Sequence, residues 1–149
     1  MEDYDLTGNL EGFTYQQLLN WALEECESFS LVTRKGTESN KEKEINKRLK
    51  PFLLEEIQTN EWPGTKVIGP PEHNLRFYKL DRNSVKILSE ANSVYSWLAP
   101  DRPEDLAFYK ENKCLWFGSG AHENMAFFNK PSFNKGEVQK RLIETAVLN

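Results

Sequence analysis

The feature that most constrains this fold is the stretch 97–128, in which two aromatic runs are separated by a short polar loop. The runs, 106–110 and 114–118, contain Phe, Tyr and Trp, which favour strands over helices. The Glu-Asn-Lys sequence between them has the length of a hairpin loop. Another apolar run, 125–128, follows a glycine-containing turn. The pattern therefore predicts an antiparallel sheet centred on this stretch.

Length and composition indicate one domain with an aromatic core. The chain has 149 residues, of which 38% are hydrophobic and 12% are aromatic. A domain of this size buries roughly 70% of the surface that its unfolded chain exposes. Helical and strand-like patterns are mixed along the chain. We therefore expect a single α+β domain over residues 1–149, with a mainly antiparallel sheet of about five to six strands packed with three to four helices.

N-terminal signals indicate the first helix. Thr14 and Gln17 have the spacing of a capping box, and apolar residues then recur at helical spacing as far as Phe29. Three carboxylates lie near its C-terminal end, where the helix dipole disfavours negative charge; these are Glu24, Glu25 and Glu27. Unless a Lys or Arg from elsewhere compensates them, they form an acidic face for a basic partner.

A second helix is expected in the strongly charged segment 41–50. Ser39 and Glu42 form a capping box before it, and Pro51 suits the first turn of a continuing helix. The apolar residues of that continuation are Phe52, Leu53, Leu54 and Ile57. The basic residues of the segment are interleaved with glutamates, and no aromatic residue is present for base stacking. A solvated helix face is therefore favoured over a nucleic-acid site.

Further elements are expected in the rest of the chain. Alternating residues predict a short strand at Ser28–Arg34, and the strand 65–69 is expected to pair with 75–80 across a loop that begins with two prolines. A helix is expected to begin within 81–84 and to run towards Val94. The last helix is expected over 136–148, where apolar residues recur at helical spacing.

Charge, hydropathy and cysteine usage argue against several classes of protein. The net charge of −4 is unfavourable for a general nucleic-acid binder, which needs a concentrated basic face. No run approaches the roughly 18 apolar residues that cross a bilayer, and the acidic N-terminal residues lack signal-peptide features. Cys26 and Cys114 form no CxxC motif, and we expect both to be buried thiols. A cytoplasmic protein with neither a membrane nor a nucleic-acid partner is expected.

A candidate for catalysis is the turn that contains His122 and Glu123, because a histidine beside a carboxylate can act as a general base. Ser119 and Asp105 could complete a nucleophilic site around His122. The Gly-Ser-Gly sequence is nevertheless too short for a nucleophile elbow, and no HExxH motif is present. A metal site would need ligands from further away, such as His73, so no metal is expected. The simpler hypothesis is that His122 anchors a turn by hydrogen bonding.

The aromatic runs also suggest a binding surface. They contain more rings than one face of a small sheet can hide, unless a further layer covers both faces. An exposed aromatic strip rimmed by carboxylates would suit protein recognition, because Trp and Tyr dominate interface hot spots. Its residues would be Trp97, Glu104, Asp105, Tyr109, Trp116, His122 and Glu123.

The sequences W-x-x-P-x-x-P-E-D-L-x-F-Y and W-F-x-S-x-x-H-E, which run from Trp97 to Glu123, resemble those of a group of small, uncharacterised bacterial cytoplasmic proteins. More distantly, the chain is similar in size, composition and α+β layout to immunity-type proteins of the SMI1/KNR4 group. This resemblance implies a protein that neutralises a toxin by binding it, often through an acidic surface. It carries no catalytic residue over to this chain.

Two functions from different classes follow. The first is a non-enzymatic protein-binding module, an immunity or antitoxin-like protein that neutralises a basic, toxin-like partner through an acidic and aromatic surface and needs no cofactor. The alternative is a small hydrolase or metal-assisted enzyme centred on His122. Convergence of His122 with Ser119 or with two carboxylates in a pocket would favour the enzyme.

Overall fold

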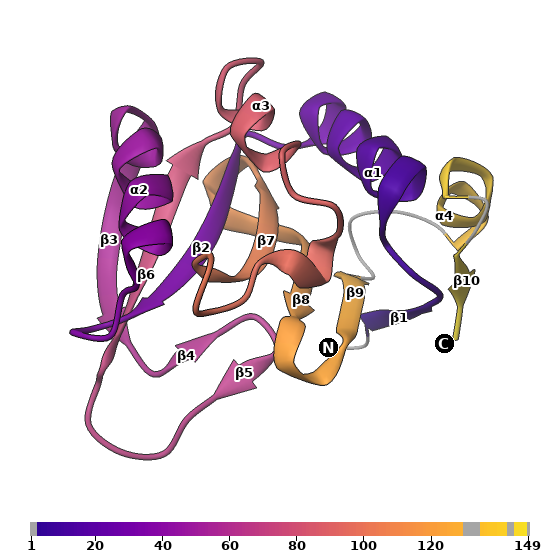
Figure 1. The fold of residues 1–149 in the computed structure, drawn as a ribbon. Helices are drawn as coiled ribbons and strands as arrows, with labels where there is room; N and C mark the ends of the chain where they lie inside the picture. The colour runs from indigo at the N-terminus through magenta and orange to yellow at the C-terminus, as the bar shows by residue number, and fades with distance from the viewer. Residues whose placement is uncertain (1–2, 130–134, 143–144, 149) are drawn as a thin grey trace.

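The centre of the computed structural model, which describes residues 3–129, 135–142 and 145–148, is an antiparallel sheet. The eight strands of this sheet follow the order β10-β1-β9-β8-β7-β2-β6-β3 (Figure 1). They are β1 (Asp3–Thr7), β2 (Ser28–Arg34), β3 (Leu53–Thr59), β6 (His73–Lys79), β7 (Glu104–Lys110), β8 (Cys114–Gly120), β9 (Met125–Asn129) and β10 (Ala146–Val147). The α+β class is confirmed, and the sheet is larger than the expected five to six strands.

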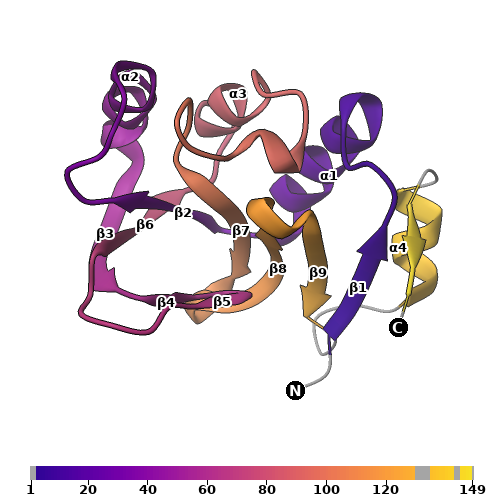
Figure 2. The same ribbon diagram turned by 60° about the horizontal axis from the view of Figure 1, so that its bottom comes forward.

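Four α-helices are present in the described residues: α1 (Gly12–Glu25), α2 (Asn40–Leu49), α3 (Ser84–Leu88) and α4 (Lys135–Arg141). Short 3-10 helices lie between these elements: η1 (Lys50–Phe52), η2 (Val94–Ser96), η3 (Glu111–Lys113) and η4 (Ala121–Glu123). Figure 2 shows α1, α2 and α3 on one side of the sheet, while the small hairpin of β4 (Glu61–Trp62) and β5 (Thr65–Lys66) lies on the other. The sheet is therefore the middle layer of the fold.

The core between the sheet and the helices is aromatic. Trp116 of β8 packs edge-on against Trp21 of α1 and against Phe128 of β9, with ring centroids 4.9 Å apart in both pairs. All three rings are buried, as is Phe108 on the neighbouring strand. Large rings of this kind bury roughly 150–250 Å² each and favour such edge-on geometry. These contacts fix α1 on the sheet.

The opposite face of the sheet carries a second buried cluster. Its members are Val32, Trp62, Leu75, Phe77, Ala107 and Tyr109. Trp62 reaches them from the β4–β5 hairpin. At Gly64 in its turn (φ 83°), a Cβ would lie 2.9 Å from the Cε atom of Met125. Because this hairpin packs so closely, it covers the central strands on the side away from the helices.

The segment after Pro51 is a strand, so the expectation of a continuing helix is wrong. Helix α2 ends at Leu49, Pro51 lies in η1, and Leu53–Thr59 forms β3 at the edge of the sheet. The spacing of the apolar residues of β3 fits the period of a helix and that of a strand, and pairing with β6 selects the strand. Long-range hydrogen bonding has here overridden a local helical pattern.

Several other expected boundaries and pairings change. Helix α1 begins at Gly12 with Glu11 as its N-cap, so Thr14 lies within the first turn and is not the expected N-cap. Residues 65–66 pair with β4 rather than with β6, which lies between β2 and β3. The expected C-terminal helix ends at Arg141, and β10 follows it. The cap at Ser39 is confirmed, because its side chain accepts a bond from the Glu42 amide.

Helix α2 buries the carboxyl group of Glu42, which leads to a prediction about pH. Burial raises the pKa of Glu42 from 4.5 to about 7, and the neighbouring Glu38 and Glu104 act in the same direction, against a hydrogen bond with Thr33. Between these two pH values the folded protein holds a proton that the unfolded chain has released, so stability falls as pH rises. We expect the free energy of unfolding to be about 1–2 kcal/mol greater at pH 5 than at pH 8 through this group.

Replacing Glu42 by glutamine isolates that contribution. Urea unfolding at several pH values should show a flatter profile for Glu42→Gln than for the original protein, with the two curves converging near pH 5. Parallel curves across the whole range would contradict a raised pKa at Glu42.

Candidate functional site

A cleft of about 660 Å³ lies between the β4–β5 hairpin and the edge formed by β7 and η4. We name it the histidine cleft, because both histidines of the chain line it. Its lining residues are Arg34, Thr37, Trp62, Thr65, Val67, Glu72, His73, Ala99, Pro100, Glu104, Asp105, Gly120, His122 and Glu123. They come from parts of the chain separated by as many as 89 residues, from Arg34 to Glu123. The cleft is therefore a product of the tertiary fold.

Asp105 connects the hairpin to η4. Its Oδ2 atom accepts a hydrogen bond of 2.8 Å from the indole Nε1 of Trp62, and its Oδ1 atom accepts one of 2.9 Å from the Ala121 amide. Burial raises the pKa of Asp105, and these two hydrogen bonds oppose the rise. Its backbone has a positive φ of 58°, a conformation that Asp tolerates better than most residues. Asp105 thus fixes the floor of the cleft.

Glu104 and His122 form a pair at the mouth of the cleft. The Nε2 atom of His122 lies 3.3 Å from Oε1 of Glu104, which also accepts a bond of 3.1 Å from the Ala99 amide. The imidazole is largely exposed, with 71% of the side chain accessible, whereas the Glu104 side chain is 21% accessible. Glu104 is therefore held in place, and His122 is free to respond to a ligand.

Asn60 positions the second histidine. Its Oδ1 atom lies 3.1 Å from Nδ1 of His73 and accepts a bond of the same length from the Glu72 amide. Its amide nitrogen donates to the carbonyls of Gly69 and Pro70. This one side chain ties together both ends of the loop that carries β4 and β5. The ring of His73 then packs on Trp62, with centroids 4.9 Å apart.

The histidine cleft is acidic. Four carboxylates line it, from Glu72, Glu104, Asp105 and Glu123, against the single guanidinium of Arg34. Arg34 forms an ion pair of 3.5 Å with Glu72, both largely exposed. A cleft lined by one sign of charge concentrates ligands of the other sign. The arrangement favours a cationic ligand.

Ser119 lies outside the cleft, so the nucleophile of the alternative function is not assembled with His122. Ser119 is buried, and its hydroxyl donates a bond of 2.7 Å to the carbonyl of Leu106. The glycine before it has a packing role, since a Cβ at Gly118 would lie 2.5 Å from the ring of Phe127. The described residues contain no group of three or more His, Cys, Asp or Glu side chains placed to hold a metal ion.

The expectation of an exposed aromatic strip is wrong. Trp97 and Trp116 are buried against the helices, and Tyr109 is buried on the opposite face, where its hydroxyl lies 2.9 Å from Oγ of Ser30. The physical reason is that helices cover one face of the sheet and the β4–β5 hairpin covers the other. Cys114, by contrast, is exposed at the start of β8, and only Cys26 is buried as expected.

Basic residues from elsewhere compensate two of the three glutamates near the end of α1. Arg141 of α4 lies 2.6 Å from Glu24, and Lys110 of β7 lies 3.7 Å from Glu25. Glu27 is exposed beyond the end of the helix. The acidic face expected here is therefore largely neutralised, and the carboxylates of the histidine cleft are the stronger candidate for a basic partner.

Asp105, His122 and Glu123, which the sequence marks as candidate site residues, all line the cleft. No local pattern in the sequence connects Trp62 or Arg34 with them. The available signal was the Trp-Pro-Gly sequence, which marks a turn but does not show where that turn packs.

The fold and the cleft together define an α+β protein with an acidic surface cleft. Comparison with protein-family models, with curated proteins and with solved structures finds no match. Among the described residues no helix has both the length and the apolar character needed to cross a membrane.

Proposed function

We propose that this protein is a non-enzymatic binding module that holds a basic segment of a partner protein in the histidine cleft. The observation that supports this proposal is the excess of four carboxylates over one arginine in the lining. A lysine or arginine entering the cleft meets Glu104, whose carboxylate the Ala99 amide holds in place. Charge-assisted bonds to such a fixed carboxylate are among the strongest polar contacts in proteins.

The partner's biological role rests on the resemblance in residues 97–123. An immunity or antitoxin-like protein binds a toxin, and an acidic cleft complements a basic toxin surface. Such complementarity raises the association rate and suppresses wrong partners. Neutralisation then requires only that the cleft cover a functional segment of the toxin.

Charge reversal in the cleft tests this proposal. We expect the double variant Glu104→Lys/Glu123→Lys to weaken binding of an acetylated tetra-arginine amide at least tenfold in titration calorimetry, which corresponds to about 1.4 kcal/mol. Glu44→Lys is the matched control, because Glu44 is exposed on α2 outside the cleft. An equal loss of affinity for the peptide in the control and in the cleft variant would show a general charge effect and would contradict the proposal.

The biological role needs a separate experiment. The product of the neighbouring gene, if toxic on expression, should be neutralised by the original protein and by Glu44→Lys but not by the double variant. Neutralisation that survives charge reversal would place the binding surface elsewhere.

The alternative function, a small hydrolase or metal-assisted enzyme, is favoured by the meeting of His122 with carboxylates in the histidine cleft. The Nε2 atom of His122 lies 3.3 Å from Glu104, and Asp105 and Glu123 line the same cleft. The variant His122→Ala separates the two functions. Loss of neutralisation with retained tetra-arginine binding would favour chemistry at His122, whereas neutralisation by His122→Ala would exclude it.

A further inference from the structure

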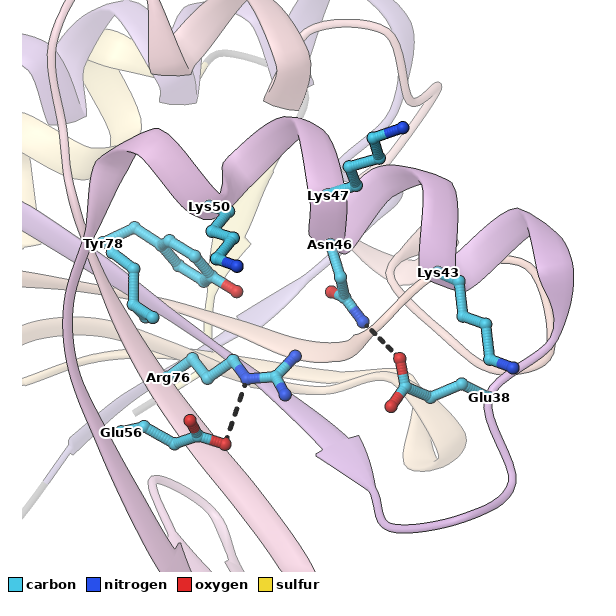
Figure 3. Close-up of a pocket in the computed structure, with 9 residues that line it drawn as sticks. Glu38, Lys43, Asn46, Lys47, Lys50, Glu56, Arg76 and Tyr78 are labelled. Atoms are coloured by element: carbon cyan, nitrogen blue, oxygen red, sulfur yellow. Dashed lines mark hydrogen bonds and ion pairs between the residues drawn. The ribbon is translucent and has the colours of Figure 1, made fainter.

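A second cavity, of about 430 Å³, lies between helix α2 and strands β3 and β6 (Figure 3). We name it the α2 pocket. It is lined by Glu38, Lys43, Asn46, Lys47, Lys50, Leu53, Glu56, Arg76 and Tyr78. Its size falls within the range of small-molecule sites. It shares no lining residue with the histidine cleft.

The α2 pocket is basic, although the whole chain has a net charge of −4. Three lysines and one arginine line it, against two carboxylates. Glu56 accepts a bond of 3.3 Å from Nε of Arg76, and Glu38 accepts one of 2.9 Å from the Asn46 amide. In the described part of the chain, no carboxylate lies within ion-pair distance of the three lysines, Lys43, Lys47 and Lys50. The pocket therefore carries positive charge in excess of its own acidic groups.

Lys50 and Arg76 both contribute positive charge to the lining of the α2 pocket. Lys50, Arg76 and Tyr78 line the same pocket, and Figure 3 shows Lys43 and Lys47 extending away at its rim. Because Arg76 uses Nε for Glu56, its terminal nitrogens remain directed towards the pocket. A planar guanidinium with two terminal donors matches the oxygen geometry of a phosphate.

Tyr78 supplies a neutral hydroxyl to the lining of the same pocket. Its side chain is buried, and burial raises its pKa to about 12, while Arg76 opposes that rise through its charge and a hydrogen bond. The hydroxyl thus keeps its proton at neutral pH. It accepts from the guanidinium, and its own proton is available for an oxygen of a ligand.

Asn46 indicates what else the ligand carries. Its amide nitrogen donates to Glu38 and to Thr33. Its Oδ1 atom is buried and has no hydrogen-bond partner among the described residues. A buried acceptor without a partner is costly, and a hydroxyl group of a ligand would satisfy it.

We propose that the α2 pocket binds a small phosphorylated molecule that also carries hydroxyl groups, with its phosphate held by Lys50, Arg76 and the Tyr78 hydroxyl. A hydroxyl of the same molecule donates to Oδ1 of Asn46. Sugar phosphates have this chemistry. The site does not depend on the proposed partner-binding function. It also gives a role to basic residues in a segment for which a nucleic-acid site is not favoured.

Titration with ribose 5-phosphate, followed by nuclear magnetic resonance of the amide signals of β6 and α2, tests the proposal. We expect Lys50→Gln to weaken binding about tenfold, and Tyr78→Phe to weaken it about 2- to 10-fold through the loss of one hydrogen bond. Lys41→Gln removes the same charge from α2 outside the pocket, where Lys41 lies 3.9 Å from Asp101, and should bind as the original protein does.

Two further ligands separate the parts of the site. Inorganic phosphate should bind more weakly than ribose 5-phosphate, and ribose alone should not bind. The proposal is overturned if ribose 5-phosphate does not bind at millimolar concentration, or if Lys50→Gln and Lys41→Gln have the same effect. Equal affinities for inorganic phosphate and ribose 5-phosphate would overturn the role of Asn46.

Discussion

Replacing Trp116 by alanine is expected to lower the free energy of unfolding by about 3–5 kcal/mol. Trp116 is fully buried and contacts Trp21, Phe108 and Phe128, so its removal leaves a cavity that rigid neighbouring rings cannot fill. Because small domains are stable by only about 5–15 kcal/mol, this one change removes a large share of the total. Urea unfolding followed by circular dichroism measures it.

Phe13→Ala is the matched control for aromatic truncation. Phe13 lies in the first turn of α1 and is 67% exposed, so its loss should change stability by less than about 0.5 kcal/mol. A small effect of Trp116→Ala, similar to that of the control, would mean that the helices do not rest on this ring cluster.

Replacing Asp105 by alanine is expected to cost about 3 kcal/mol, because two buried donors, Trp62 Nε1 and the Ala121 amide, lose their acceptor together. Alanine at a φ of 58° adds about 1 kcal/mol of backbone strain. Asp105→Asn keeps the shape and tolerates that backbone, but its amide can accept from only one of the donors. We therefore expect a loss of about 1–2 kcal/mol for asparagine.

The same substitution should detach the β4–β5 hairpin. Tryptophan fluorescence of folded Asp105→Ala should shift to longer wavelength as Trp62 becomes accessible to water. Glu123→Ala, in the same cleft but exposed, serves as the control and should leave both stability and emission unchanged. An unshifted emission spectrum for Asp105→Ala would show that apolar packing alone holds Trp62 in place.

The parts of the fold that local sequence determines could be predicted. The hairpin of β7 and β8 and the strand β9 were expected from aromatic runs and short turns, and the Ser39 cap from its spacing to Glu42. The strands β1, β3 and β10 were not expected, because each exists through pairing with a distant strand. Their own residues carry weak or ambiguous periodicity, so only the whole sheet decides their conformation.

Some residues of the candidate site could be predicted from the sequence, and others are brought in only by the fold. His122, Glu123 and Asp105 lie within one short stretch, and their chemistry is visible in the sequence. Trp62 and His73 join them only because the β4–β5 hairpin, which follows β3, packs on the face of the sheet away from the helices. Asn60 holds the two ends of the loop that carries this hairpin together. The α2 pocket depends on Arg76 and Tyr78 from β6 facing the lysines of α2, which no local pattern reveals.

The position of β1 beside β9 has a consequence for biosynthesis. Tyr4 pairs with Phe128, so roughly 120 residues must be translated between one strand and its neighbour in the sheet. At about 5–20 residues per second, β1 waits on the order of ten seconds for β9. During that interval Trp21 of α1 lacks Phe128, one of the rings against which it packs. The aromatic core is therefore completed only when β9 has been translated and Phe128 can pack between Trp21, Trp116 and Phe117.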